Sequence, residues 1–303
     1  MGPKDGTRLG DVLVRAGADA DAVSEGRVFV GKRRASSMEV PVRPGDEVHI
    51  AAPQGGPDDL APATILAEEG GIVAADKPAD LVTTPDHGGA TASLLASVAR
   101  ALGTEARSLH PTSRLDRGVS GVVIFARTAS SAERLRLARV EGTYARRYVA
   151  IASALPEPAR GEWDAPIGRA KDARHRAAHG PEGAPALSRY AVVATTGTWS
   201  LLALEPVTGR THQLRVHAAH AGAPLLGDRV YGGPSRVTLQ SGRVLSFTRI
   251  GLHAARVRVP RADRGTMEVS SPIPAELLAS WRALGGEDAA WEAALTEIFT
   301  PHP

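Results

Sequence analysis

A chain of 303 residues that contains no cysteine has no disulfide framework, no thiol nucleophile and no thiolate metal site, so its chemistry must come from other side chains. Its net charge of +3 is too small to indicate a nucleic-acid partner by itself. The sequence begins without the apolar run of a signal peptide and has no later apolar run long enough to span a bilayer, which predicts a soluble, cytoplasmic protein.

The positive charge is concentrated in one part of the chain. Nine arginines stand against three acids between Arg107 and Arg147, whereas three arginines stand against seven acids from Arg261 onward. This asymmetry predicts a basic face of the kind that follows a phosphate backbone. A solvated, arginine-rich helix face gives the same pattern, so charge alone does not establish nucleic-acid binding.

The first fifty residues are predicted to form a small α/β unit. The spacing of Leu9, Val12 and Leu13 is helical, and it is followed by short strands at 27–30, 40–42 and 48–50, with a basic turn at 32–34. The polar stretch that follows is rich in glycine and proline, which is typical of a linker. We therefore divide the chain into a small domain (1–52), a linker (53–62) and a large domain (63–303).

The large domain is predicted to be α+β. Strands are expected at 72–75, 122–126, 148–152, 189–195, 200–205 and 252–259. Helices are expected at 129–140, 212–221, 276–284 and 289–299. Strands spaced this irregularly, without regular strand and helix alternation, favour a mixed, mostly antiparallel sheet flanked by helices. The stretch 174–185 contains glycine and proline and is expected to be a flexible connection.

A carboxylate between two arginines is the first candidate for chemistry. Arg114, Asp116 and Arg117 lie in a short loop segment that continues through Gly118 to Gly121 and precedes an apolar strand. Cationic neighbours can keep such a carboxylate ionised in a dry site. A surface cluster of one aspartate and two arginines would look the same, so the segment is a weak signal by itself.

The second candidate is the segment from Thr208 to His217. Thr211 is placed to cap a helix, and Arg215 lies one turn further, where it could pair with a carboxylate. The histidines at 212, 217 and 220 raise the question of a metal site. They offer no pair at i, i+4 and no interleaved acid, so no metal is expected.

These segments belong to five motifs that occur in the order found in a known family. The motifs are Gly71-Ile72-Val73-Ala74-Ala75-Asp76-Lys77-Pro78, then Arg114-Leu115-Asp116-Arg117 with Ser120-Gly121, then Arg146-Arg147-Tyr148-Val149-Ala150, then Gly209-Arg210-Thr211-His212-Gln213-Leu214-Arg215-Val216-His217, and finally Gly222, Pro224, Leu226-Gly227-Asp228 and Tyr231-Gly232. Over residues 65–284 the chain therefore resembles the RluA-type pseudouridine synthases. Ser113 stands where this family commonly has a histidine.

The small domain carries a resemblance of its own. Residues 7–50 resemble the RNA-binding domain first described in the fourth ribosomal protein of the small subunit. The basic helix usual in that domain is replaced by an acidic segment at 18–23, and residues 1–52 hold eight bases and eight acids. The module is therefore expected to be degenerate and electrically neutral.

The resemblance implies an enzyme that isomerises uridine within structured RNA. The bond between the ribose and a ring nitrogen breaks, the uracil rotates, and a ring carbon is joined to the sugar, so no cofactor is required. Catalysis is assigned to Asp116, to Arg215 as its ion-pair partner, and to Tyr148, which would stack on the uracil and relay a proton. Attack on the ribose, attack on the pyrimidine and elimination through a glycal remain open as roles of the aspartate.

RNA binding and base flipping are assigned to a second group of residues. Arg114 would enter the stack that the flipped uridine leaves, and the remaining contacts are expected from Arg117, Arg210, His212 and Gln213.

The expected partner is structured RNA, bound by a monomer that contacts no membrane. Ribosomal RNA of the large subunit is favoured, because a small N-terminal domain of this type more often accompanies enzymes with that substrate. Transfer RNA is the alternative substrate, and a catalytically silent RNA-binding or ribosome-assembly factor is the alternative function. The sequence does not identify the uridine that is modified.

Overall fold

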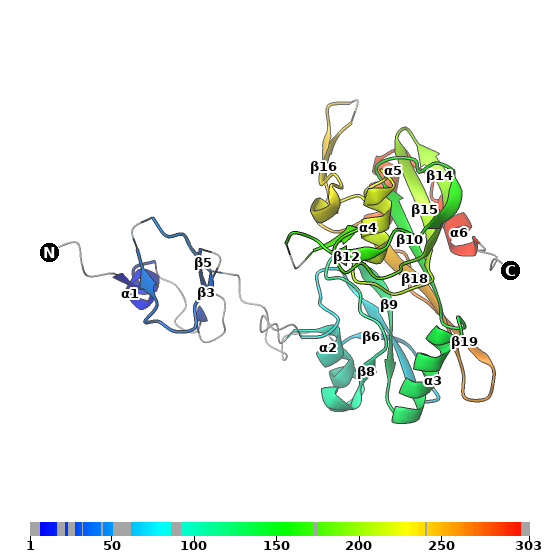
Figure 1. The fold of residues 1–303 in the computed structure, drawn as a ribbon, viewed down its shortest axis with the longest axis horizontal. Coiled ribbons are helices and arrows are strands. Elements are labelled where there is room, and N and C mark those ends of the chain that lie inside the picture. The colour runs from blue at the N-terminus through cyan, green and yellow to red at the C-terminus, as the bar shows by residue number, and fades with distance from the viewer. Residues whose placement is uncertain are drawn as a thin grey trace.

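The structure is a computed structural model that describes residues 7–16, 22–23, 28–31, 33–43, 45–50, 62–85, 92–172, 175–239 and 241–297. Figure 1 shows the arrangement of its helices and strands. Residues 18–21 of the predicted acidic segment and residues 53–61 of the predicted linker lie outside these ranges.

The N-terminal residues build a small apolar core of their own. Helix α1 (Leu9–Arg15) buries Leu9 and Leu13 against Val28, Ala35 and Val42. The strands are β1 (Thr7–Arg8), β2 (Val28–Val30), β3 (Arg33–Arg34), β4 (Pro41–Val42) and β5 (Val48–Ile50). The basic residues predicted as a turn in fact include β3, which pairs with β2 in a three-stranded sheet of order β3-β2-β5.

A ten-stranded sheet forms the centre of the larger part, with the order β11-β14-β15-β10-β18-β9-β7-β6, and with β19 paired to β18 and β8 to β9. These strands are β6 (Thr64–Glu69), β7 (Ile72–Lys77), β8 (His110–Pro111), β9 (Ser120–Ala126), β10 (Ala145–Ala152), β11 (Arg160–Trp163), β14 (Ser188–Thr196), β15 (Trp199–Pro206), β18 (Leu252–Pro260) and β19 (Thr266–Ser270). Among the described pairs of this sheet, only β9 with β18 is parallel. The predicted α+β class with a mixed, mostly antiparallel sheet is confirmed.

Helices cover both faces of this sheet. They are α2 (Leu94–Ala101), α3 (Ala129–Val140), α4 (Gln213–His220), α5 (Ala275–Ala283) and α6 (Ala289–Thr296), with short 3-10 helices η2 (Ala106–Ser108) and η3 (Arg229–Tyr231). Because strand side chains alternate, Val73 and Ala75 join the core under α2 and α4, whereas Ile72 and Ala74 join the core under α3. Helices α5 and α6 contribute Trp281 and Trp291 to a third cluster.

Two small hairpins lie outside the sheet. Strands β12 (Ile167–Arg169) and β13 (Arg176–Ala178) form one, and β16 (Arg236–Thr238) and β17 (Val244–Ser246) form the other. The stretch 174–185 was expected to be a flexible connection, and this was wrong for its described part. Residues of β13 pair with β12, and His179 N donates to Pro166 O.

The parallel contact between β9 and β18 sets the place of the loop that contains Asp116. Gly121 faces Ala254 in this contact and has φ +116, and a Cβ there would collide with the carbonyl oxygen of Ala254. A glycine is therefore required where the loop enters β9. Ile250 N also donates to Gly118 O at 3.2 Å, so the loop is held at the start of both strands.

All six strands and four helices predicted for the larger part are present, with small changes at their ends. Strands β6, β8, β11 and β19 of the sheet and helix α2 were not predicted. The residues of β6 include good helix formers such as Leu66, Glu68 and Glu69, and the strand exists because it pairs with β7 at the edge of the sheet. Residues 298–299 of the last predicted helix lie outside the described ranges.

Candidate active site

A cleft of about 450 Å³ opens where six separate chain segments meet. It is lined by residues of the segment 82–85, of the loop 113–119 and of the segment from Pro206 into α4, and by Arg139 of α3, Arg146 and Tyr148 of β10, and Leu252 of β18. Asp116, Tyr148, Arg215, Arg114, Arg210, His212 and Gln213 all line it, so the structure brings together seven of the eight residues predicted for the site. Arg117 does not belong to the lining of the cleft.

Asp116 and Arg215 meet in this cleft although they are 99 residues apart in sequence. Arg215 Nη1 donates to Asp116 Oδ2 at 2.8 Å. The side chain of Asp116 is 24% exposed and that of Arg215 is 6% exposed, so the carboxylate faces the cleft and the guanidinium lies behind it. A partly dry ion pair of this geometry orients a carboxylate while leaving its other oxygen available.

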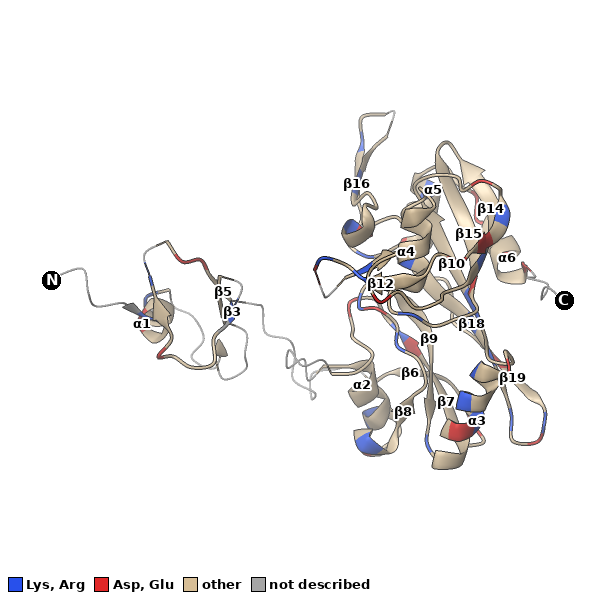
Figure 2. Ribbon diagram, in the orientation of Figure 1, with Lys and Arg blue, Asp and Glu red and all other residues tan. Residues whose placement is uncertain are grey.

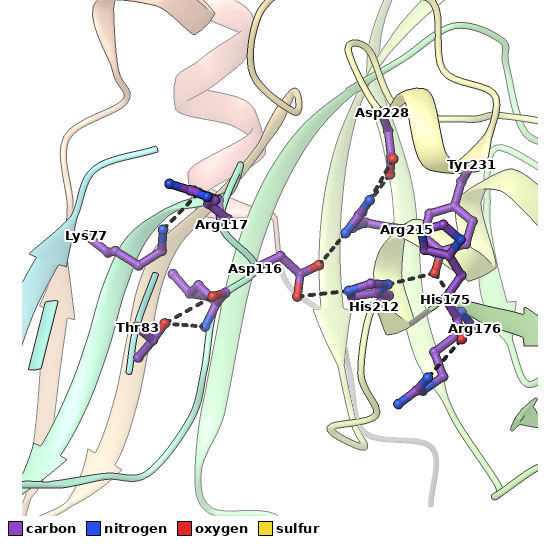
Figure 3. A network of polar contacts seen from close by, with 11 residues as sticks. Lys77, Thr83, Asp116, Arg117, His175, Arg176, His212, Arg215, Asp228 and Tyr231 are labelled. Atoms are coloured by element: carbon purple, nitrogen blue, oxygen red, sulfur yellow. Dashed lines mark hydrogen bonds and ion pairs between the residues drawn. The ribbon is translucent and has the colours of Figure 1, made fainter. Parts of the chain in front are cut away.

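Asp228 fixes the other edge of the Arg215 guanidinium. Arg215 Nε and Nη2 donate to the two oxygens of Asp228 at 2.7 and 2.8 Å, and the Asp228 side chain is 1% exposed. Burial disfavours the charge on Arg215, but hydrogen bonds and charges of Asp228 and Asp116 outweigh burial and raise the pKa of the guanidinium. Arg215 is therefore a permanent cation held between two carboxylates, as Figure 3 shows.

His212 approaches the second oxygen of Asp116. Its Nε2 lies 3.7 Å from Asp116 Oδ1, and its Nδ1 lies 2.7 Å from the hydroxyl of Tyr231. The backbone N–H of Arg176 donates to the same hydroxyl at 3.0 Å. With its oxygen accepting from that N–H, the hydroxyl is free to donate its proton to Nδ1, which places the proton of neutral His212 on Nε2, toward Asp116.

Burial and the charges around it keep His212 neutral. Burial lowers the pKa of the imidazole and Arg215 lowers it further, against the opposing charges of Asp116 and Asp228. His212 also has a left-handed backbone, with φ 58, at the start of α4. Thr211 was predicted to cap this helix, and that prediction was wrong, because His212 occupies the N-cap position and no side chain caps the helix.

Two buried side chains hold the loop that carries Asp116. The Thr83 hydroxyl accepts a hydrogen bond from Leu115 N and donates one to Leu115 O, each at 3.0 Å. Lys77 donates to the carbonyl oxygens of Pro78, Leu81 and Arg117, and burial lowers its pKa to about 7. Figure 3 shows the contacts of Thr83, and that of Lys77 with Arg117, beside Asp116.

Tyr148 lies on β10 next to an irregularity of the strand. The register between β10 and β18 shifts between Arg147 and Tyr148, which is a bulge of the kind that redirects a side chain at a site. Tyr148 is 7% exposed and lines the cleft with Asp116. Burial raises the pKa of its hydroxyl, which keeps the phenol protonated.

Gln213 lines the cleft but uses its amide inside the protein. Its oxygen accepts from Thr208 Oγ1 at 2.7 Å and from Arg210 N at 2.9 Å, and its nitrogen donates to Leu187 O and Ser188 Oγ at 2.9 Å each. All four hydrogen-bonding positions of the amide are therefore occupied. The side-chain amide of Gln213 therefore has no free donor or acceptor for the predicted direct contact with RNA. Its hydrogen bonds instead hold the loop before α4.

The arginines predicted to bind RNA differ in whether their guanidinium groups already make hydrogen bonds within the protein. Arg114 is exposed at the cleft, and its guanidinium makes no hydrogen bond or ion pair with any residue that the structure describes. Arg210 donates from Nε to Pro185 O, and Arg117 donates from Nε to Asp80 O, both at 2.9 Å. Arg114 is thus the member of this group most available to a ligand.

The arginine-rich stretch from 107 to 147 does not form one basic face. Arg127 pairs with Glu68, and Arg136 pairs with Glu133 at 2.8 Å on the exposed side of α3. Figure 2 shows basic and acidic residues side by side on α3. The cleft receives Arg114, Arg139 and Arg146 from this stretch.

Several residues of the site were not assigned a role from sequence. Asp228 and Tyr231 were noted only as parts of the last motif, and Lys77 only as part of the first, while Thr83 and Arg139 were not noted at all. Asp228 and Tyr231 stand 13 and 19 residues from the side chains they orient. The only signal for Asp228 in the sequence was an acidic residue directly after a Leu-Gly pair. That signal did not indicate which side chain Asp228 would contact.

Two further findings bear on the chemistry available to the chain. Among the residues that the structure describes, no cluster of three or more histidines or acids is arranged to hold a metal ion. No helix in the described ranges is long and apolar enough to cross a membrane.

Comparisons with known proteins agree with this geometry. Residues 71–220 match the model of the RNA pseudouridylate synthase family. An RNA pseudouridine synthase of Chlorobaculum parvum is 32% identical over 84% of this chain and 85% of that protein. Ribosomal large subunit pseudouridine synthase D of Pasteurella multocida is 31% identical over 90% of this chain and 83% of that protein.

A solved structure shares the fold. Human RNA Pseudouridylate Synthase Domain Containing 4 superposes with a TM-score of 0.59 at 24% identity, over 73% of this chain and 93% of that one. The resemblance noted in the five motifs is thereby confirmed for the larger part of the chain, whereas the family model does not extend to the residues before 71. This chain belongs to the RNA pseudouridine synthase family.

Proposed function

We propose that this enzyme isomerises specific uridines in large-subunit ribosomal RNA, with Asp116 acting at the sugar. The observation that carries the catalytic assignment is the ion pair of Asp116 with Arg215 at 2.8 Å inside the cleft. The ribosomal target is supported by relatives named as ribosomal large subunit pseudouridine synthase D, from Pasteurella multocida, Haemophilus ducreyi and Vibrio parahaemolyticus, at 30–32% identity.

The reaction conserves every atom of the nucleotide. The bond between N1 of uracil and C1′ of ribose breaks, a bond between C5 and C1′ forms, C5 loses a proton, and N1 gains one. Cleavage develops positive charge at the sugar, which the ionised Asp116 stabilises. Because the base is retained rather than replaced by water, one carboxylate suffices where a glycosidase uses two.

The surrounding residues divide the remaining work. Arg215 keeps Asp116 oriented, and neutral His212 presents a proton toward its second oxygen. Tyr148 faces the flipped base. Because its phenol is protonated, it relays the C5 proton by releasing its own proton to water as it accepts the one from C5. Arg114 enters the vacated stack, where its free planar guanidinium replaces part of the lost stacking energy.

The contacts with RNA are proposed to extend beyond the cleft. Arg210 and the exposed Arg117 reach the phosphates on either side of the flipped nucleotide. Residues 1–52 form a docking module for the same RNA, residues 53–62 the linker, and residues 63–303 the catalytic domain. Because residues 1–52 contain eight bases and eight acids, electrostatic attraction by this module contributes little to the affinity for RNA.

Chemical mapping of pseudouridine in ribosomal and transfer RNA tests this proposal. The two RNA classes are compared between cells with the gene and cells without it. The proposal expects a pseudouridine in large-subunit ribosomal RNA that is lost with the gene and restored by the wild-type gene but not by an Asp116→Ala allele. A loss confined to transfer RNA would contradict the ribosomal target, and restoration by the Asp116→Ala allele would contradict the catalytic assignment.

A further inference from the structure

Arg139 has hydrogen-bond donors that the protein does not use. It lies in the last turn of α3, and its guanidinium stacks over the ring of Tyr144 at 4.4 Å from the centroid. Its Nη2 is buried and has no hydrogen-bond partner. No hydrogen bond or ion pair joins this guanidinium to any residue within the described ranges, yet Arg139 lines the cleft. A buried cationic donor without an acceptor is an unfavourable arrangement unless a ligand supplies the acceptor.

Arg146 of β10 lies in the same cleft and shares this property in part. Its Nη2 donates to Pro206 O at 3.0 Å and to Thr208 O at 2.8 Å, which anchors it to the loop before α4. Its Nε is buried and has no hydrogen-bond partner among the residues that the structure describes. Orphaned buried nitrogens also occur on Arg134 and Arg256, but neither residue lines the cleft.

The two guanidinium groups act on the residue that is proposed to face the base. Burial raises the pKa of the Tyr148 hydroxyl, and the charges of Arg146 and Arg139 oppose that shift while the charge of Asp116 adds to it. Both arginines also line the cleft together with Tyr148, and this cleft is where the nucleotide is proposed to bind. The cleft lining also includes Arg114, Arg210 and Arg215, and of these three Arg215 is already neutralised by Asp116 and Asp228.

Arg139 is also held in advance by neighbours of the catalytic loop. The Tyr144 hydroxyl lies 3.1 Å from Thr112 Oγ1, and Thr112 Oγ1 donates to Ile124 O at 3.0 Å. Thr112 precedes Ser113 and Arg114 directly in the chain. The stacking surface under Arg139 is thus fixed to the loop that carries Asp116, which makes the position of its guanidinium a property of the site rather than of a mobile surface side chain.

We propose that Arg139 and Arg146 form a phosphate-binding subsite that receives a backbone phosphate next to the flipped uridine. The inference rests on the proposed action of the enzyme on RNA. A guanidinium presents a planar fork of donors that matches two phosphate oxygens, and a phosphodiester carries the negative charge that the two unneutralised cations call for. The subsite fixes the backbone while the base rotates within the cleft.

The first test measures RNA binding in a background that cannot turn over. The parent protein is the Asp116→Ala variant, and the probe is a short single-stranded RNA with one central uridine, titrated at several KCl concentrations. Adding Arg139→Gln is expected to weaken binding and to reduce the slope of log Kd against log salt by about 0.7, the contribution of one phosphate contact on a single strand. An unchanged slope would overturn the proposal, and so would absence of salt-dependent binding by the parent.

A matched control comes from the same helix. Arg136 is one turn away on α3, exposed and paired with Glu133 at 2.8 Å. Arg136→Gln in the same background removes an equal charge, and its slope is expected to stay that of the parent. If Arg136→Gln reduced the slope as much as Arg139→Gln, the effect would be one of net charge and the subsite would be excluded. Arg139→Lys, which keeps a charge but not the planar fork, is expected to keep the slope while losing affinity.

The second test locates the phosphate. The probe is prepared with a neutral methylphosphonate at one linkage at a time, and each version is bound to the parent and to the Arg139→Gln protein. Neutralising one linkage adjacent to the uridine is expected to weaken binding to the parent more than binding to the Arg139→Gln protein, in which only Arg146 still meets that phosphate. Independent losses at every linkage would overturn the proposal. Because the readout is binding, a failure of the subsite is distinguishable from a failure of the proposed function, which appears as missing pseudouridine in ribosomal RNA.

Discussion

Asp228 receives two hydrogen bonds from Arg215, at 2.7 and 2.8 Å, and so leaves that guanidinium a single edge with which to hold Asp116. The three side chains come from the catalytic loop, from α4 and from the segment before η3. Asp228 does not line the cleft, and it acts on Asp116 through Arg215. The centre of the site is therefore a buried cation shared by two carboxylates, of which Asp116 lines the cleft and Asp228 does not.

Asp228→Asn should weaken both the fold and the reaction. Removing one charge of a buried pair costs about 3–5 kcal/mol of unfolding free energy, because Arg215 is left under-neutralised. We expect kcat to fall more than KM rises, since Arg215 no longer holds Asp116 in one orientation. Chemical denaturation and steady-state kinetics measure the two effects. Asp263→Asn, at an exposed turn, is the control, and equal losses in the two variants would contradict this role.

Tyr231→Phe tests the orientation of His212. The change removes the hydroxyl that accepts from Arg176 N and contacts His212 Nδ1, while the ring that stacks on Arg215 at 4.9 Å remains. Loss of one orienting hydrogen bond of about 1 kcal/mol should lower kcat about fivefold, with KM and the thermal midpoint little changed. Tyr190→Phe is the matched control, because the Tyr190 hydroxyl donates to Pro158 O. Equal effects of the two substitutions on kcat would argue against an orienting role of the Tyr231 hydroxyl.

Lys77 gives the fold a pH dependence whose sign is defined. Its folded pKa of about 7 lies below the ordinary value of 10.5, chiefly because of burial. Between those values the unfolded chain binds more protons, so the contribution of Lys77 to stability rises with pH and is lost as pH falls through about 7.

Denaturation of Lys77→Met measures this contribution. The unfolding free energy of the wild type relative to Lys77→Met should increase above pH 7 by up to about 1.4 kcal/mol per pH unit. Groups common to both proteins cancel in this difference. Lys171→Met, at an exposed position, is the control for the loss of one lysine. A constant difference for Lys77→Met would show that its pKa is not lowered.

Arg114→Ala separates base flipping from chemistry. The variant should slow product formation on a uridine within a stem more than on the same uridine in an unstacked strand, because only the stem loses stacking when the base leaves. The ratio of kcat/KM on the two RNAs is the measurement. Equal losses on both RNAs would assign Arg114 a general contact with phosphate in place of a flipping role.

The sequence predicted which residues line the cleft better than it predicted the hydrogen bonds and contacts between them. Asp116, Arg215 and Tyr148 could be named because each stands in a motif that pairs residue type with order along the chain. Thr83 and Arg139 could not be named, since their partners are Leu115 and Tyr144, and a hydroxyl or a stacked arginine acquires such a role only through tertiary contact.

Local propensity also failed where tertiary structure decides the backbone. Thr211 has the chemistry of a helix cap, yet the left-handed turn at His212 moves the start of α4 one residue on, so the cap is absent. Gln213 looked available to RNA by composition, and its four internal hydrogen bonds are visible only in three dimensions. For β6, pairing with β7 overrides residues that favour a helix.

Release of the C5 hydrogen tests the central claim most directly. Ribosomal RNA labelled with tritium at C5 of uridine is incubated with the wild-type enzyme and with Asp116→Ala, and binding of the same RNA is measured for both. Isomerisation must release that tritium to water, because C5 becomes bonded to the sugar. We predict release by the wild type, no release above background by Asp116→Ala, and nearly equal binding by the two. Release by Asp116→Ala at the wild-type rate would contradict the assignment of Asp116 as the catalytic carboxylate.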